Sequence, residues 1–84
     1  MKKPVYTCKD SRVLRDGVVV FVEFREAGIW KQKARMDTNR VMGAMYPDKF
    51  PGMTEEQREQ LRQSLIAGII GGMKKHHGVS QVGN

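Results

Sequence analysis

The feature that most constrains this chain is the stretch from Val18 to Met36, which reads VVVFVEFREAGIWKQKARM. Its first half is filled by β-branched and aromatic residues, which favour strands. Its second half alternates cations with other residues, and the short segment Glu26-Ala27-Gly28 separates the two halves. Two strands joined by a tight turn are therefore expected here, and the rest of the chain should be arranged around this hairpin.

The length of this turn decides which side chains share a face of the sheet, because a slip of one residue turns a whole strand over. A three-residue loop over residues 26–28 pairs Phe24 with Trp30 and Val20 with Ala34. It directs Lys31, Lys33 and Arg35 to one face and gathers the apolar residues on the other, namely Val18, Val20, Val22, Phe24, Trp30, Ala34 and Met36. A two-residue loop would place the cations beside the valines, so the three-residue loop is the prediction.

A further strand is expected upstream, over residues 5–15, with Asp10-Ser11 as a point where it could break or bulge. Asp16-Gly17 follows, and an Asp-Gly pair between apolar runs is a strong signal for a two-residue hairpin loop. Such a loop would pair Arg15 with Val18 and Arg12 with Phe21. Together with residues 18–36 this predicts a three-stranded antiparallel meander.

Helix signals dominate the second half of the chain. Asp37 could cap a short helix, although residues 40–46 could equally form an additional strand. Thr54 and Gln57 have the spacing of a capping box at the start of a longer helix. That helix should run from about Glu55 to the Lys74 region, with its first two turns in solvent and Gly78 as its stop. Its apolar stripe consists of Leu61, Leu65, Ile69 and Met73, widened by Ile66 and Ile70.

Small residues are unusually frequent inside this helix, where each glycine costs roughly 0.8–1 kcal/mol relative to alanine. One interpretation is close packing against the sheet or a second helix; the other is that the helix frays or ends at Gly71-Gly72. The first makes this a candidate dimer or partner face, consisting of Ser64, Ala67, Gly68, Gly71 and Gly72.

The expected fold class is therefore α+β: a three-stranded antiparallel sheet packed against one long C-terminal helix, with the short helix between them as one alternative. The chain has 84 residues, which fits a single domain over 1–84 with flexible ends near 1–4 and 79–84. A domain of this size buries only about 60% of its unfolded surface, so homodimerisation or a bound partner would help to stabilise it.

Composition narrows the class of partner and compartment. The net charge is +6, from 15 basic and 9 acidic residues, and this favours a polyanion or an acidic protein surface. Cys8 is the one cysteine, which excludes an internal disulfide and favours a reducing, cytoplasmic location. The apolar runs are too short to span a bilayer, so no membrane association is expected.

No catalytic arrangement, metal site or cofactor motif stands out, and the chain is not expected to be an enzyme. The adjacent His76 and His77 would point about 100° apart on a helix and could not converge on one metal ion. No glycine-rich phosphate loop and no nucleophile with a neighbouring base is present in the sequence.

The cations of the hairpin are the strongest functional signal. In the preferred register a basic sheet face carries one aromatic ring, and its members are Arg12, Phe21, Arg25, Lys31, Lys33 and Arg35. Cations on such a face can contact phosphates, and the ring can lie in a groove or stack on a base. The alternatives are that these lysines protect a sheet edge from aggregation or that they contact an acidic protein.

Three strands followed by a helix, with a cationic sheet face, resemble the arm-type DNA-binding domains of phage tyrosine recombinases. The segment Arg40-Val41-Met42-Gly43-Ala44-Met45-Tyr46-Pro47, followed by Thr54-Glu55-Glu56, is similar to the end of such a domain, and the resemblance covers about half of the chain.

Two functions are consistent with these patterns. The first is a small basic intracellular nucleic-acid-binding protein, accessory or regulatory and of phage or mobile-element type, with DNA favoured over RNA. The second is a non-enzymatic protein-binding module, an inhibitor or adaptor of a host protein, that could be homodimeric. The helix face of small residues and the adaptable methionines favour the second.

Overall fold

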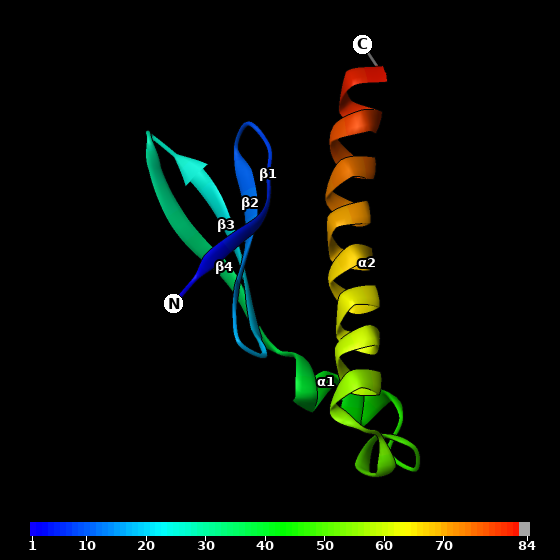
Figure 1. Ribbon diagram of the computed structural model, residues 1–84. Coiled ribbons are helices and arrows are strands. Elements are labelled where there is room, and N and C mark those ends of the chain that lie inside the picture. The colour runs from blue at the N-terminus through cyan, green and yellow to red at the C-terminus, as the bar shows by residue number, and fades with distance from the viewer. Residues whose placement is uncertain (83–84) are drawn as a thin grey trace.

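The computed structural model describes residues 1–82, and side chains as far as Lys75, and its fold is α+β. One antiparallel sheet has the strand order β1-β2-β3-β4, in which the strands are β1 (Lys3–Thr7), β2 (Ser11–Asp16), β3 (Val19–Glu26) and β4 (Ile29–Asp37). The helix α1 (Thr38–Met45), the 3-10 turn η1 (Phe50–Gly52) and the helix α2 (Glu55–Val82) follow. Figure 1 shows α2 running along one side of the sheet, nearest β1 and β2.

The sheet has four strands and the predicted three is wrong, because residues 5–15 do not form one strand. They divide between β1 and β2, with a turn across residues 8–10 in which the Cys8 amide donates to the Ser11 carbonyl (2.9 Å). The polar pair Asp10-Ser11 therefore marks a complete reversal of the chain. β1 begins at Lys3, inside the segment that was expected to be flexible.

The β2–β3 hairpin is confirmed, but its pairing differs from the predicted one by two residues. Asp16 pairs with Val19 and Arg12 with Glu23, so the loop consists of Gly17 and Val18. Gly17 has a φ of +60° at the first loop position, where a type II′ turn needs a positive φ. A shift of two residues leaves every side chain on its predicted face.

The predicted three-residue loop between β3 and β4 is wrong. The loop is Ala27-Gly28, with φ of 52° and 77°, as a type I′ turn requires. Further along, the pairs Glu23–Gln32 and Val22–Ala34 leave Lys33 as the extra residue of a β-bulge. Between the bulge and α1, the side chains of β4 lie on the faces that the sequence predicts, and Val20 is opposite Met36. Between the bulge and the tip, the side chains of β4 lie on the opposite faces from those predicted.

The core lies between α2 and one face of the sheet. Val13, Val20 and Ile66 form its buried centre, surrounded by Tyr6, Ile69, Ile70 and Met73. We call this side of the sheet the helix-facing side and the opposite side the outer face.

Four residues predicted for the core lie elsewhere: Val18 is in the β2–β3 loop, Ala34 is exposed on β4, and Phe24 and Trp30 lie toward the hairpin tip. Phe24 is on the helix-facing side but 45% exposed, beside Ile29 at 61%, because the hairpin tip extends away from the buried centre. Trp30 pairs with Arg25 and therefore lies on the outer face.

Both helix starts form the caps that the sequence predicts. The Asp37 carboxylate accepts hydrogen bonds from the backbone amides of Asn39 (3.0 Å) and Arg40 (3.3 Å), which confirms the short helix and excludes the additional strand. Thr54 and Gln57 exchange the two bonds of a capping box, at 2.9 and 3.1 Å.

The end of α2 differs from the prediction. The helix does not end at Gly71-Gly72, and it passes Gly78, the predicted stop, to reach Val82. Residues 79–82 of the expected loose tail are therefore helical, and residues 83–84 lie outside the described part of the chain.

A hydrogen-bonded network, which we call the junction, joins β2, α1 and α2. Arg62 is only 4% exposed and donates to Thr38 Oγ1 (2.7 Å), Asn39 Oδ1 (2.5 Å) and Glu59 Oε1 (2.7 Å). Arg15 donates to both carboxylate oxygens of Glu59, at 2.8 and 2.7 Å. The N-terminal turns of α2 are thus partly buried, whereas the sequence predicted them to stand in solvent.

Candidate nucleic-acid interface

The outer face is built from rows of side chains that cross-strand pairing places next to one another. One row is Arg12, Glu23 and Gln32, and the next is Leu14, Phe21 and Arg35. Arg25 and Trp30 form a third row near the hairpin tip. Because residues paired across strands point to the same face, arginines from β2, β3 and β4 converge here.

Trp30 organises two of these arginines. The Arg12 guanidinium lies 4.3 Å from the centroid of the indole ring, and that of Arg25 lies 5.3 Å from it. Arg12 also donates from Nε to Glu23 Oε1 at 2.8 Å. Cation–π contacts of this kind hold guanidinium groups in place, so less side-chain entropy is lost when they bind an anion.

The remaining aromatic ring of the face supports a lysine. Lys2 Nζ lies 4.2 Å from the centroid of Phe21 and 3.8 Å from Glu23 Oε2. Phe21 is 8% exposed, so its ring serves as a floor beneath Lys2. This burial leaves little of the ring surface for stacking on a base.

The charges of the outer face are unevenly distributed. Lys2, Arg12, Arg25 and Arg35 share the central and tip rows with one carboxylate, that of Glu23. At the opposite end Asp16 pairs with the Met1 amino group (2.8 Å), and Asp37 caps α1. Among the described side chains, Arg35 has no carboxylate within 4.0 Å. The uncompensated positive charge of the outer face therefore lies at Arg25, near the hairpin tip, and at Arg35, further along β4.

The structure brings together four of the six predicted interface residues, Arg12, Phe21, Arg25 and Arg35, and separates the two lysines from them. Lys31 pairs with Phe24 on the helix-facing side, and Lys33 is the bulge residue. Their amino groups lie 3.5 and 3.1 Å from the carboxylate of Glu26. Hydrogen bonding and charge attraction from Lys33, followed by the hydrogen bond from Lys31, lower the pKa of Glu26.

Sequence reasoning missed Trp30 and Lys2. Trp30 was assigned to the helix-facing side because a three-residue loop was expected, and the two-residue loop reverses that assignment. The only available signal was the Ala27-Gly28 pair itself, which can form the shorter turn. Lys2 carried no signal, because its position depends on how β1 pairs with β2.

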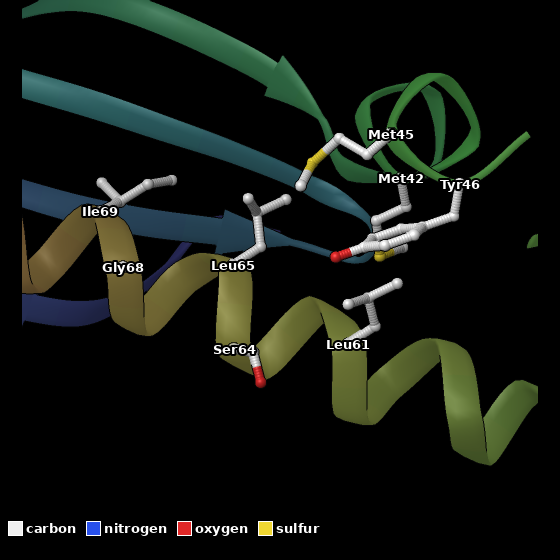
Figure 2. A pocket seen from close by; sticks show the side chains of 8 residues that line it. All are labelled: Met42, Met45, Tyr46, Leu61, Ser64, Leu65, Gly68 and Ile69. Atoms are coloured by element: carbon white, nitrogen blue, oxygen red, sulfur yellow. The ribbon is translucent and has the colours of Figure 1, made fainter.

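A second candidate surface lies between the two helices, in a groove of about 410 Å³ that we call the α1–α2 groove. Its walls are uncharged and consist of Met42, Met45, Tyr46, Leu61, Ser64, Leu65, Gly68 and Ile69. Figure 2 shows the Tyr46 ring and Met45 on the α1 side, facing Leu61 and Leu65 of α2. Of the predicted small-residue face, Ser64 and Gly68 line this groove, whereas Ala67, Gly71 and Gly72 are exposed outside it.

The structure was also inspected for metal-binding clusters and for membrane-spanning helices. Within the described residues no three His, Cys, Asp or Glu side chains are placed to hold a metal ion together. The predicted pair His76-His77 falls among residues whose side chains are not described. In the same part of the chain, no helix is long and apolar enough to cross a membrane.

Comparison with known proteins adds no assignment. No protein-family model, curated protein or solved structure matches this chain. The resemblance to arm-type DNA-binding domains stays a prediction.

Proposed function

We propose that this chain is a small intracellular nucleic-acid-binding protein, accessory or regulatory in role, that contacts the phosphate backbone through its outer face. The observation that carries this proposal is the convergence of Arg12, Arg25 and Arg35 on one face, with Trp30 holding two of them in place. Arginine presents a planar fork of donors that matches phosphate oxygens, and its weak hydration suits a contact that must lose water.

Duplex DNA is the form of nucleic acid that this shape favours. The major groove of B-DNA admits a two-stranded β-ribbon, whereas the major groove of A-form RNA is too narrow for side chains to read. The β3–β4 hairpin ends in a tight two-residue loop and carries Arg25 and Trp30 next to it. Since Glu23 is shared between Lys2 and Arg12, Arg25 and Arg35 are the cations most available to phosphates.

A binding assay with matched double variants tests this proposal. Fluorescence anisotropy with labelled duplex DNA, duplex RNA and single-stranded DNA would be recorded over a series of salt concentrations. Arg25→Gln with Arg35→Gln should weaken binding to duplex DNA by roughly fivefold or more. It should also make the slope of log affinity against log salt less steep by about 1–2.

The control is Lys49→Gln with Lys75→Gln, which removes the same charge from exposed positions away from the outer face. It should leave affinity and slope close to those of the unmodified chain. No change in anisotropy with any of the nucleic acids at low salt, or an equal loss of affinity in the two double variants, would show that the outer face is not a nucleic-acid interface. Stronger binding to RNA or to single strands would overturn the choice of duplex DNA.

A protein-binding role is the second candidate function, and the α1–α2 groove is the specific observation that favours it. An apolar groove with uncharged walls suits a protein side chain or helix and offers nothing to a phosphate.

A further inference from the structure

We propose that the outer face reads base sequence in addition to contacting phosphates, and that Gln32 recognises adenine in the major groove of duplex DNA. This inference rests on the proposed function, because it assigns a base contact to the same face. Three properties of the described residues support it: the position of Gln32 between two arginines, the unused hydrogen-bonding groups of its amide, and the β-bulge that follows it.

Gln32 lies along β4 between the two arginines that are most available to phosphates. The row of Arg25 and Trp30 is two residues nearer the hairpin tip, and Arg35 is three residues nearer α1. At a rise of about 3.3 Å per residue these rows lie roughly 7 and 10 Å from Gln32, which corresponds to two or three base steps of about 3.4 Å. Phosphate contacts fix the register of a protein on DNA, and a side chain between them can then reach a base edge.

The side-chain amide of Gln32 is available to a ligand. Gln32 is exposed, and among the described residues its amide has no hydrogen-bond partner. Its cross-strand neighbour Glu23 already binds Arg12 at 2.7 Å and lies 3.8 Å from the amino group of Lys2. These two cations offset the carboxylate that would otherwise repel DNA next to Gln32. Both the donor and the acceptor of the amide are therefore free to bind a base.

The β-bulge at Lys33 brings Gln32 and Arg35 to the same face of the sheet. Residues three apart on a regular strand point to opposite faces. The extra residue Lys33 shifts this alternation, so that Gln32 and Arg35 both point outward. One strand therefore carries a neutral amide and a phosphate-binding cation toward the same surface, and re-aiming a side chain in this way is a common role of bulges near binding sites.

Adenine is the base that uses both groups of a glutamine amide. In the major groove it presents the N7 acceptor and the N6 donor side by side, and a carboxamide supplies the matching donor and acceptor. Guanine presents two acceptors at the corresponding positions, and a phosphate presents acceptors alone, so each would leave the amide oxygen of Gln32 without a partner. Arginine suits those two ligands better, which makes a glutamine among arginines a group for reading adenine.

Selection from a library of duplexes with randomised base pairs tests whether the face reads sequence. The unmodified chain should enrich duplexes that share an adenine at one position. Gln32→Ala should lose this preference and should bind the enriched duplex roughly tenfold more weakly, which is the order of discrimination that a bidentate base contact provides. Gln60→Ala removes the same side chain from an exposed position on α2 and should leave the preference intact.

Replacing the preferred adenine by 7-deazaadenine identifies the atom that Gln32 contacts. This analogue still pairs with thymine but lacks the N7 acceptor. It should weaken binding of the unmodified chain by roughly fivefold. It should have no further effect on Gln32→Ala, because the contact is already absent there. The same replacement at an adenine outside the preferred position is the matched control.

The outcomes separate this inference from the proposed function. Binding that depends on Arg25 and Arg35 but has no sequence preference would overturn the role of Gln32 and leave the phosphate contacts in place. A preference that persists in Gln32→Ala, or an equal effect of 7-deazaadenine on both proteins, would overturn it as well. No binding to any duplex would contradict the proposed function together with this inference. Because Gln32 is exposed, the circular dichroism of Gln32→Ala should match that of the unmodified chain, so a loss of preference reports a lost contact.

Discussion

The junction and the hairpin tip are stabilised in opposite ways. At the junction, the buried Arg62 donates hydrogen bonds to acceptors on two helices, and Thr38, one of these acceptors, is fully buried. At the tip, Phe24 and Ile29 are exposed, and ion pairs to Glu26 are the principal side-chain contacts of the nearby lysines. The difference teaches that the junction determines whether the chain folds, while the tip is available to bind something else.

Removing one charge at the buried junction should therefore lower the free energy of unfolding more than a change at the exposed tip does. Glu59→Gln should lower the free energy of unfolding by about 1–2 kcal/mol at neutral pH, because it removes the counter-charge of the buried Arg62 and weakens the bidentate bond to Arg15; water around the partly exposed carboxylate screens the rest of the loss. Urea unfolding followed by circular dichroism measures this. Glu56→Gln, on the same helix but with no ion pair in the described residues, should cost less than about 0.5 kcal/mol.

The pH profile of the same variant tests the cause. Hydrogen bonds from Arg15 and then Arg62 lower the pKa of Glu59 from 4.5 to about 2. A lowered pKa in the folded state means that the stabilisation is complete above about pH 4.5 and is lost as the pH falls toward 2. The unmodified chain should therefore lose stability in this window, and Glu59→Gln should lose less. The stability of Glu59→Gln should still fall somewhat with falling pH, and Glu26, whose pKa is also lowered, accounts for part of that remaining dependence. Parallel profiles for the two proteins would contradict the role given to Glu59.

Much of the fold is encoded locally, and the parts that were predicted correctly are those with short-range causes. The capping box of Thr54 and Gln57 and the cap at Asp37 need only residues within three positions of one another. The burial of Arg62 had no such signal. Its acceptors Thr38 and Asn39 lie 24 and 23 positions away, and only the packing of α1 against α2 brings them together.

The candidate interface shows the same limit. Arg12, Arg25 and Arg35 could be placed on one face because pairing registers that differ by two residues preserve facing. Lys31 and Trp30 were predicted on the wrong faces. A two-residue loop was rejected because it would have put cations beside the valines, but the bulge at Lys33 corrects the register before the strand reaches Val22 and Val20. Such a bulge depends on how the whole sheet packs and leaves no pattern in the strand itself.

A smaller effect should separate a glycine of α2, beyond the junction, from a glycine of the hairpin tip. Gly71 is helical with open space around it, so Gly71→Ala should raise the free energy of unfolding by about 0.8 kcal/mol through helix propensity. Gly28 has a φ of +77° in the tip loop, so Gly28→Ala should lower it by about 1 kcal/mol. Thermal and urea unfolding of both variants measure the difference. A loss of stability in Gly71→Ala would mean that this part of α2 has a close neighbour, and the open face of the helix would have to be reconsidered.

The smallest effect concerns Ala27, which has a φ of 52° although it is not glycine. Asparagine tolerates this left-handed conformation better than alanine, and Asn-Gly is the preferred sequence for a type I′ turn. Ala27→Asn should therefore stabilise the tip by about 0.5 kcal/mol. If the tip unfolds together with the junction, the gain appears in global urea unfolding. If the tip opens by itself, the gain appears only as slower hydrogen exchange of the Glu26 and Ile29 amides.

The same change in the exposed helical position, Ala67→Asn, should lower stability by about 0.6 kcal/mol, which excludes a general benefit of asparagine. Faster exchange at the tip in Ala27→Asn would contradict the assignment of the turn, and with it the register that places Trp30 among the arginines.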